Sequence, residues 1–381
     1  MRILLIGPCH DQGSLPPYLD VLAEGLRAHG AMVDRLGATT PPFDRERNVF
    51  WPAERIIQAA DALLDSVDLR KYDLLLVHFG NQEIEQLIPV RWQGLPRPPA
   101  VHHVHSPDWS LFADNVPNPE LRRAVAEGVY RMDGLVYFGS YARQRLEGTP
   151  AAKLPSIVSF FPSTIPTGIS TTDESMPVLD WLGQDDGVPR ASLYGFASPW
   201  KDLPGLLAAF EQMRAPLRFA LAGSTWHLSQ HAGTDMAAAV FPRTQRIGPV
   251  ELTIVASYLD PSQRAALVAA TDLAIVPYRS HPNFQGSGAI TDYLAHGVPV
   301  VATDVANMRE LVQDGGLLVP AGNPTALAGA LDQLAGDAGL RGRLRQSAQQ
   351  RASQFTPEAH AASCLAFYRR VASARGRPRG S

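Results

Sequence analysis

Short apolar runs alternate with longer amphipathic stretches along most of this chain. Apolar runs of this length predict strands that are buried on both faces, and the stretches between them predict helices packed on a parallel sheet. The clearest helix spans residues 15–29, where leucines recur at helical spacing and Gly30 provides a stop. The predicted strands of the first half are residues 2–6, 32–36, 73–77, 100–104, 134–138 and 156–160.

The pattern changes after residue 161. Up to residue 190 the chain is rich in Ser, Thr, Pro, Gly and Asp and has little periodicity, which predicts a linker over 166–190. Two series of strands separated in this way predict two open α/β sheets with a cleft between their domains. The second series of predicted strands comprises residues 191–196, 218–222, 252–257, 273–277, 299–302 and 317–320.

Charge and cysteine content exclude several classes of protein. The 381 residues include 34 Lys and Arg against 37 Asp and Glu, a net charge of −3, which argues against binding to nucleic acid. Cys9 and Cys364 stand at opposite ends of the chain and favour neither a disulfide framework nor a cysteine-rich zinc site. No apolar run approaches the length of a membrane span. We therefore expect a soluble, cytoplasmic protein with no integral membrane segment.

Ligands of such sheets sit beyond the carboxyl ends of the strands, so the residues there are the candidates for chemistry. After the first strand, Gly13 and Ser14 precede a helix, and their backbone N–H groups are placed to approach a diphosphate. A plain strand-to-helix turn explains these residues about as well. The dinucleotide fingerprint G-x-G-x-x-G is absent here, which disfavours a nicotinamide dehydrogenase.

Histidines cluster at the ends of the third and fourth strands. Alternation along the fourth strand places His103 and His105 on one face and His102 on the other. A zinc site is conceivable, but without a carboxylate or thiolate partner nearby the favoured interpretation is that one or two of these rings are satisfied in the core. His105 lies furthest toward the carboxyl end and is the best candidate to face a ligand. Three further candidates, for acceptor binding or else for packing, are His78, Asn81 and Trp109.

In the second half, cationic and amide groups follow two strands. Lys201 comes just after the first strand of the series, where an ammonium group can neutralise phosphate. An isolated lysine is, however, usually only a solvated side chain. A loop rich in Gly and Ser leads to a short predicted helix over 290–296, and backbone amides at its start would point at an anion. Asp292, one turn into this helix, is placed to accept hydrogen bonds from ribose hydroxyls.

Taken in order, these segments resemble the family-4 retaining glycosyltransferases, which have the GT-B fold of two facing Rossmann-like domains. The family pattern G-R-L-x-x-x-K-G looks like residues 195–202, GFASPWKD. Its pattern E-A-x-A-x-G-x-P-V-V looks like residues 292–301, DYLAHGVPVV, and residues 309–320 are similar to its E-I-V-x-D-G-x-x-G-L-L-V-P stretch with one residue fewer. The resemblance is closest over residues 193–334 and looser before them.

The resemblance implies a role for several residues. Lys201 matches the lysine that contacts the donor diphosphate, Asp292 stands where a glutamate holds the ribose, and His105 matches a histidine near the transferred sugar. Lys201 and His105 are therefore the candidate catalytic residues, and no metal ligand is expected. The implied donor-binding set is Gly13, Ser14, Ser198, Lys201, Ser287, Gly288, Ala289 and Asp292.

Three positions depart from the family pattern. Phe196 replaces an arginine beside the diphosphate, Phe284 replaces the first glutamate of the motif E-x7-E, and Asp292 shortens the second. Losing a cation and a carboxylate there is compatible with an altered donor, with compensation by other residues, or with no transfer. The fold inference depends less on these positions than the inference of activity does.

The implied architecture is an N-terminal acceptor-binding domain over 1–165, the linker over 166–190 and a C-terminal nucleotide-sugar-binding domain over 191–355. A C-terminal helix over 356–372, with packing back on the N-terminal domain as one option, and a tail over 373–381 follow. The implied activity is retaining, metal-independent transfer from a UDP or GDP sugar to a small soluble acceptor such as a natural-product intermediate, with no further cofactor. A sugar-nucleotide epimerase or hydrolase and a non-catalytic GT-B binding subunit stay open as alternatives.

Overall fold

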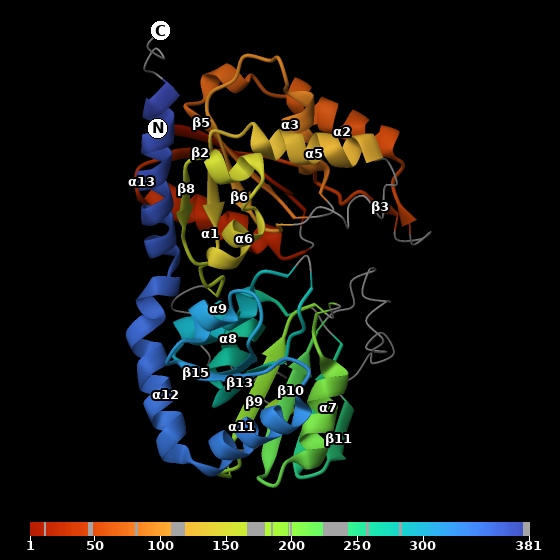
Figure 1. Ribbon diagram of the computed structural model, residues 1–381, viewed down its shortest axis with the longest axis vertical. Helices are drawn as coiled ribbons and strands as arrows, with labels where there is room; N and C mark the ends of the chain where they lie inside the picture. Colours follow the sequence, from red (N-terminus) through yellow and green to blue (C-terminus); the bar gives the residue numbers. More distant parts are fainter. Residues whose placement is uncertain are drawn as a thin grey trace. The chain divides into compact units, whose positions relative to one another are not determined.

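The computed structural model describes residues 1–10, 13–44, 49–80, 83–107, 119–165, 180–183, 186–196, 198, 200–223, 243–256, 259–281 and 284–375. The chain divides into two compact units, and each has its own mainly parallel sheet (Figure 1). The N-terminal unit comprises residues 1–161 and 357–381, and the C-terminal unit comprises residues 162–356. The helix that follows residue 356 therefore belongs to the N-terminal unit.

The sheet of the N-terminal unit has six parallel strands in the order β2-β1-β5-β6-β7-β8. All six predicted strands are confirmed, with ends that differ by at most two residues. The four central strands are largely apolar and almost fully buried, whereas the edge strands β2 and β8 are only partly buried or exposed at most positions. The bounds of the six strands are Arg2–Ile6 (β1), Met32–Leu36 (β2), Leu74–Phe79 (β5), Ala100–Val104 (β6), Gly134–Tyr137 (β7) and Ser156–Val158 (β8). The pair Phe43–Asp44 (β3) and Val49–Phe50 (β4) is too short to leave a pattern in the sequence.

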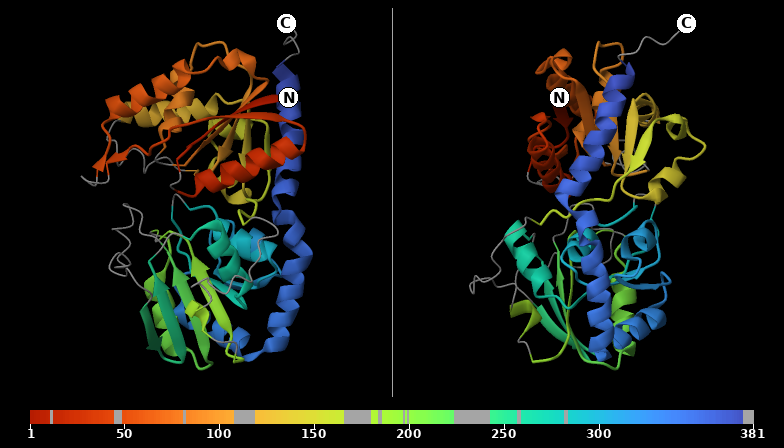
Figure 2. Two further views of the ribbon diagram at one scale, coloured as in Figure 1. Left: turned by 180° about the vertical axis from the view of Figure 1, so that it is seen from behind. Right: turned by 90° about the vertical axis from the view of Figure 1, so that its left-hand side faces the viewer.

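Helices cover both faces of this sheet (Figure 2). One face packs against α1 (Leu15–Ala28) and α13 (Pro357–Arg375), which approach so closely that a Cβ on Gly25 would lie 2.7 Å from Cβ of Ala361. The other face packs against α2, α3, α5, α6 and the 3-10 turn η2. Their bounds are Ala53–Asp65 (α2), Ile84–Leu87 (η2), Ile88–Arg91 (α3), Pro119–Tyr130 (α5) and Ser140–Arg145 (α6), with further 3-10 turns at Leu69–Lys71 (η1) and Pro150–Lys153 (η3).

The sheet of the C-terminal unit has seven strands in the order β11-β12-β10-β9-β13-β14-β15. The six predicted strands are confirmed within two residues, but β11 was not predicted and runs antiparallel to β12 at the sheet edge. Its side chains are polar and mostly exposed, so no apolar run marks it. The bounds are Arg190–Tyr194 (β9), Leu217–Ala222 (β10), Arg243–Ile247 (β11), Val250–Val255 (β12), Leu273–Val276 (β13), Val300–Thr303 (β14) and Gly316–Val319 (β15).

Most helices of this unit begin at a side-chain cap. Asp202, Asp260, Asn323 and Asp337 each accept a hydrogen bond from a backbone N–H of the first turn, which satisfies a donor that the helix itself cannot. The helix α9 differs, because Ser287 at its start makes no such bond. The bounds are Leu203–Gln212 (α7), Pro261–Ala269 (α8), Gly288–Ala295 (α9), Met308–Val312 (α10), Pro324–Gly336 (α11) and Ala338–Arg351 (α12), with 3-10 turns at Asp180–Leu182 (η4) and Ala352–Phe355 (η7).

Each sheet contains a point where the strand order reverses. In the N-terminal unit the chain runs from β1 outward to β2 on one side and through β5 to β8 on the other. In the C-terminal unit it runs from β9 to β10 on one side and through β13 to β15 on the other. The loops that leave adjacent strands at such a point diverge and leave a crevice at the carboxyl edge, where open α/β sheets bind ligands. None of the described helices is long and apolar enough to cross a bilayer.

Candidate functional site

The loops after β9 and β13 are tied together at the reversal point of the C-terminal unit. Lys201 and Tyr278 form an antiparallel bridge, and beside it the N–H of Arg279 donates to the carbonyl of Trp200 at 2.7 Å. The N–H of Asp202 donates to the carbonyl of Pro277 at 2.7 Å. These bonds fix the backbone of Lys201 at the carboxyl edge of the sheet, as its position after a strand predicted.

Lys201 is a buried cation. Its side chain is only 8% exposed, and Nζ donates to the carbonyl oxygen of Tyr194 at 3.1 Å. Among the described residues no carboxylate forms an ion pair with it. Burial lowers the pKa of Lys201 from 10.5 to about 7, because the ammonium loses water without gaining a counter-charge. An anionic ligand would supply that counter-charge.

The start of α9 lies next to this lysine through Tyr278. The hydroxyl of Tyr278 lies 3.1 Å from Oγ of Ser287, the residue before the helix. Residues 286–289 are partly exposed, and the amides of Gly288 and Ala289 belong to an uncapped first turn. Tyr278 thus links the loop of Lys201 to the start of α9, and donor binding by Lys201, Ser287, Gly288 and Ala289 stays a prediction. Sequence reasoning missed Tyr278, although its place directly after a strand and before the Gly/Ser-rich loop marked it for attention.

Ser198 shapes the turn that leads to the lysine. Its carbonyl oxygen accepts the N–H of Lys201 at 3.0 Å, and its side chain is only 9% exposed. The described contacts therefore give Ser198 a backbone role in placing Lys201, and donor binding by its side chain stays a prediction.

Asp292 lies on α9, but its carboxylate is engaged by the protein itself. Oδ1 accepts from Oγ of Ser163 and from the N–H of Thr164, both at 2.7 Å, and Oδ2 accepts from the hydroxyl of Tyr194. Arg264 lies 3.9 Å from Oδ2 and donates to Thr164 at 2.8 Å. The side chain is only 1% exposed, so a ribose would have to displace one of these donors. Binding of ribose by Asp292 stays a prediction.

The phenylalanine at the second departure from the family pattern is part of an aromatic cluster. Phe284 is 2% exposed, its ring stacks on Trp200 at 5.9 Å and meets Tyr278 edge-on at 4.9 Å. Phe284 therefore packs in an apolar cluster at the position where the family pattern has a glutamate. Phe196, the other departure, is partly exposed just past β9.

The first turn of α1 offers fewer backbone amides than the start of α9. Gly13 has a φ of 98°, a conformation that favours glycine, and a Cβ there would meet nothing within 4 Å. Ser14 precedes α1 with an exposed side chain that makes no capping bond. However, Pro16 and Pro17 lack N–H groups, so the first turn of α1 has lost two of its donors. The predicted contact of Gly13 and Ser14 with a diphosphate remains a prediction.

Most histidines of the N-terminal unit, namely His78, His103, His105 and His360, gather in one cluster of rings around Tyr18. His102 faces away from the others and places Nδ1 2.9 Å from the carbonyl of Val77. His103 lies within hydrogen-bond distance of Tyr18 and Tyr368, at 2.8 and 2.5 Å. Both rings are buried in the core and lie on opposite faces as alternation predicted. The two ring nitrogens of His103 both have partners, the interpretation that the spacing favoured, whereas Nε2 of His102 is buried without a described partner.

His78 and His105 form a pair in the same cluster. Nδ1 of His78 lies 3.2 Å from Nε2 of His105. His105 is partly exposed, whereas His78 is 0% exposed and would reach an acceptor only after its surroundings open. Burial, followed by neighbouring histidines, lowers the pKa of both rings well below the usual range, so both are neutral near pH 7.

Two predicted acceptor residues, Asn81 and Trp109, lie outside the described residues. Within the described ranges, no group of three or more His, Cys, Asp and Glu side chains is arranged to hold a metal ion. The zinc interpretation of the histidines therefore gains no support from the geometry.

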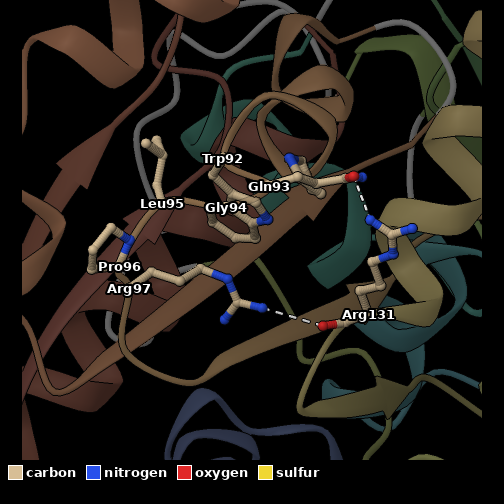
Figure 3. A pocket seen from close by; sticks show the side chains of 8 residues that line it. Trp92, Gln93, Gly94, Leu95, Pro96, Arg97 and Arg131 are labelled. Atoms are coloured by element: carbon tan, nitrogen blue, oxygen red, sulfur yellow. Dashed lines mark hydrogen bonds between the residues drawn. The ribbon is translucent and has the colours of Figure 1, made fainter.

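A cavity of about 330 Å³ lies in the N-terminal unit (Figure 3). It is lined by residues that precede β6 and β7, and ligands of parallel sheets bind at the other edge. Arg97 lies over the ring of Trp92 at 4.8 Å and pairs with Asp133 at 3.0 Å, so its charge is already balanced. We do not place the reaction here. The lining residues are Pro89, Trp92, Gln93, Gly94, Leu95, Pro96, Arg97 and Arg131.

Solved structures decide the fold. Sucrose-phosphate synthase from Thermosynechococcus elongatus matches with a TM-score of 0.71 at 18% identity, covering 98% of this chain and 99% of that one. Anabaena HepE, solved in complex with UDP-glucose, matches with a TM-score of 0.63 at 17% identity, covering 99% of both chains. The chain has the GT-B fold. Identities at this level carry no argument about activity.

Sequence relatives of this GT-B protein point to sugar transfer. Residues 192–337 match the family of glycosyl transferases group 1. A D-inositol 3-phosphate glycosyltransferase from Stackebrandtia nassauensis is 28% identical over 81% of this chain and 71% of its own length. One from Jonesia denitrificans is 34% identical, but the match covers only 30% of this chain and 27% of the relative. Together these likenesses support a glycosyltransferase.

Proposed function

We propose that this protein moves a sugar from a nucleotide diphosphate to a small acceptor, with retention of the anomeric configuration. Structures of similar fold were solved with UDP and UDP-glucose, and curated relatives are named for transfer to inositol 3-phosphate. Those names favour a UDP type of donor and a small polyhydroxylated acceptor, and a GDP type of donor stays open. Retention follows from the resemblance to family-4 enzymes.

The observation that carries the proposal is the buried ammonium group of Lys201. It lies at the reversal point of the sheet, it has a single described hydrogen bond, and no described carboxylate pairs with it. A buried cation is costly unless a counter-ion joins it, so the site is built to gain stability when an anion binds. The uncapped start of α9 adds amide donors beside it.

The reaction needs positive potential at the departing diphosphate. Negative charge builds on the leaving phosphate while the sugar carbon becomes oxocarbenium-like, and fixed donors stabilise that charge without reorganising. Lys201 and the amides of Ser287, Gly288 and Ala289 supply these donors. Transfer is therefore expected to continue in the presence of EDTA. His105 contacts the sugar and does not act as a nucleophile.

A second candidate function is a binding subunit that does not transfer sugar. Two observations favour it: Phe284 is packed under Trp200 and Tyr278, and both carboxylate oxygens of Asp292 are engaged within the unit. Neither position then offers a free carboxylate to the donor. On this alternative the protein binds a nucleotide sugar without turnover.

A panel of sugar nucleotides tests both candidates. Nucleotide release that depends on an added acceptor supports transfer, release without acceptor supports a hydrolase, and binding without release supports the binding subunit. Lys201→Met is expected to weaken UDP or GDP binding by about 10-fold to 100-fold, the value of a charge-assisted hydrogen bond. Lys153→Met, at an exposed lysine, is the matched control. An unchanged dissociation constant in Lys201→Met would contradict the proposed anion site.

A further inference from the structure

The two paired histidines, His78 and His105, differ in their exposure to solvent. His78 belongs to β5 and is 0% exposed, whereas His105 follows the end of β6 and is partly exposed. Nδ1 of His78 and Nε2 of His105 lie 3.2 Å apart, so one of these nitrogens donates a proton to the other. Only His105 can meet a ligand without a rearrangement, and its remaining ring nitrogen is Nδ1.

Aromatic neighbours hold the ring of His105 in place. Tyr18 meets it edge-on at a centroid distance of 5.1 Å, and Phe138 packs against it at 4.8 Å. Tyr18 is itself fixed, because its hydroxyl lies 2.8 Å from Nδ1 of His103 and 2.9 Å from Nε2 of His360. The orientation of the His105 ring is therefore set by its surroundings. What remains to be determined is which of its two ring nitrogens carries the proton.

Two arrangements of the protons are possible, since both rings are neutral near pH 7 and a neutral imidazole carries one N–H. In the first, His78 donates through Nδ1 and keeps a bare Nε2. In the second, His105 donates through Nε2, and His78 must then carry its proton on its own Nε2. That nitrogen of His78 is buried, and it has no hydrogen-bond partner among the described residues.

The first arrangement of the protons has the lower free energy. A buried N–H without an acceptor is rare in folded proteins, and an unsatisfied acceptor is tolerated somewhat more often. The nearby positive charge of Arg35, which contributes to lowering the pKa of His78 after burial and the neighbouring histidines, also favours a bare lone pair over an N–H. His78 then donates, and His105 must carry its proton on Nδ1.

We propose that His78 is a positioning residue that fixes His105 as the Nδ1–H tautomer, so that His105 offers a hydrogen-bond donor to an oxygen of the sugar substrate. The identity of the ligand rests on the proposed function, but the tautomer does not. A ring held in this way donates and does not accept a proton from the acceptor hydroxyl. The atom it recognises is a hydroxyl or ring oxygen and not an ammonium group.

Imidazole nitrogen NMR of protein labelled with ¹⁵N-histidine tests the tautomer directly. We expect the wild-type spectrum to show a bare Nε2 and a protonated Nδ1 for His105. His78→Leu is expected to release this preference, and His78→Asn, whose amide takes the place of Nδ1, to restore it. A wild-type His105 protonated on Nε2 would overturn the proposal, whether or not the variants fold.

His102→Asn is the matched control for these spectra. His102 is equally buried, lies on the neighbouring strand to His78 and uses Nδ1 for its own bond to Val77, but it faces the other side of the sheet. Its substitution is expected to leave the His105 signals unchanged. The spectra do not depend on turnover. Even if the protein proves inactive with the panel of sugar nucleotides, they still test the proposed tautomer of His105.

The contact with substrate is tested by two substitutions at one position. His105→Asn keeps a donor at the place of Nδ1, and His105→Gln moves it to the place of Nε2. We expect kcat/KM for His105→Gln to fall about 100-fold, the effect of removing one donor to the transition state, and His105→Asn to retain about ten times more activity than His105→Gln. The reverse order of the two variants would overturn the donor role.

Discussion

Binding of a nucleoside diphosphate should draw a proton from solution. Burial lowers the pKa of Lys201 to about 7, so at pH 8 only about one molecule in ten of the free protein carries the ammonium charge. A bound diphosphate supplies the missing counter-charge and returns the pKa toward its ordinary value of 10.5. Binding at pH 8 is then accompanied by the uptake of about 0.9 proton, and affinity falls about tenfold per pH unit above 7.

Calorimetric titration of UDP or GDP in buffers of different ionisation enthalpy measures this uptake. Lys201→Arg is the informative control, because guanidinium stays charged and should bind the nucleotide without taking up a proton. Lys201→Met should bind weakly at every pH. Tight binding by the wild type at pH 8 with no proton uptake would refute the reasoning, since the lysine would then be charged before the ligand arrives.

Three further outcomes are expected. Burial raises the pKa of Glu85 from 4.5 to about 7, so the stability that its protonated form contributes is complete below pH 4.5 and is lost as the pH rises to 7, in total about 3 kcal/mol. Glu85→Gln should remove this dependence of the unfolding free energy on pH, measured by urea titration at pH 5 and 8. The same pH dependence in the variant and the wild type would contradict the role of Glu85. Asp292→Ala leaves three donors without their acceptor, two of them buried and one partly buried, and should lower the free energy of unfolding by about 3 to 5 kcal/mol in urea denaturation. A loss of less than 1 kcal/mol would argue against a stabilising role of this carboxylate. Tyr278→Phe removes the bond to Ser287 and should raise the dissociation constant for UDP or GDP by about 3-fold to 10-fold in calorimetry; no change would mean that the start of α9 is placed without it.

The sequence was sufficient where the signal is local. Each central strand is an apolar run, so two sheets and the position of Lys201 after β9 follow from the pattern alone. The edge strand β11 is polar and exposed and gives no such signal. Alternation placed His103 beside His105, but it could not show that His360 from α13 joins them, because that partner lies more than two hundred residues away.

Long-range partners also explain why the sequence could not assign the role of Asp292. Its position on a helix near a Gly/Ser-rich loop suggested a ligand contact, but Ser163 and Thr164 reach it from 129 and 128 residues earlier in the chain. Spacing along a sequence shows which residues share a face of one helix or strand. It does not show which distant segment donates hydrogen bonds to a carboxylate on that face. Tyr278 had a local signal in its place after a strand, but its pairing with the distant Lys201 leaves no trace in the sequence.

The participation of α13 in the core of the N-terminal unit constrains how the chain matures. Buried side chains of this helix, among them His360 and Tyr368, complete the layer against α1. During synthesis the first 161 residues therefore emerge from the ribosome without that layer, while residues 162–356 can close their own core earlier. The segment made first is the one that finishes last, and a nascent chain halted before residue 357 should expose the apolar face of α1 to chaperones.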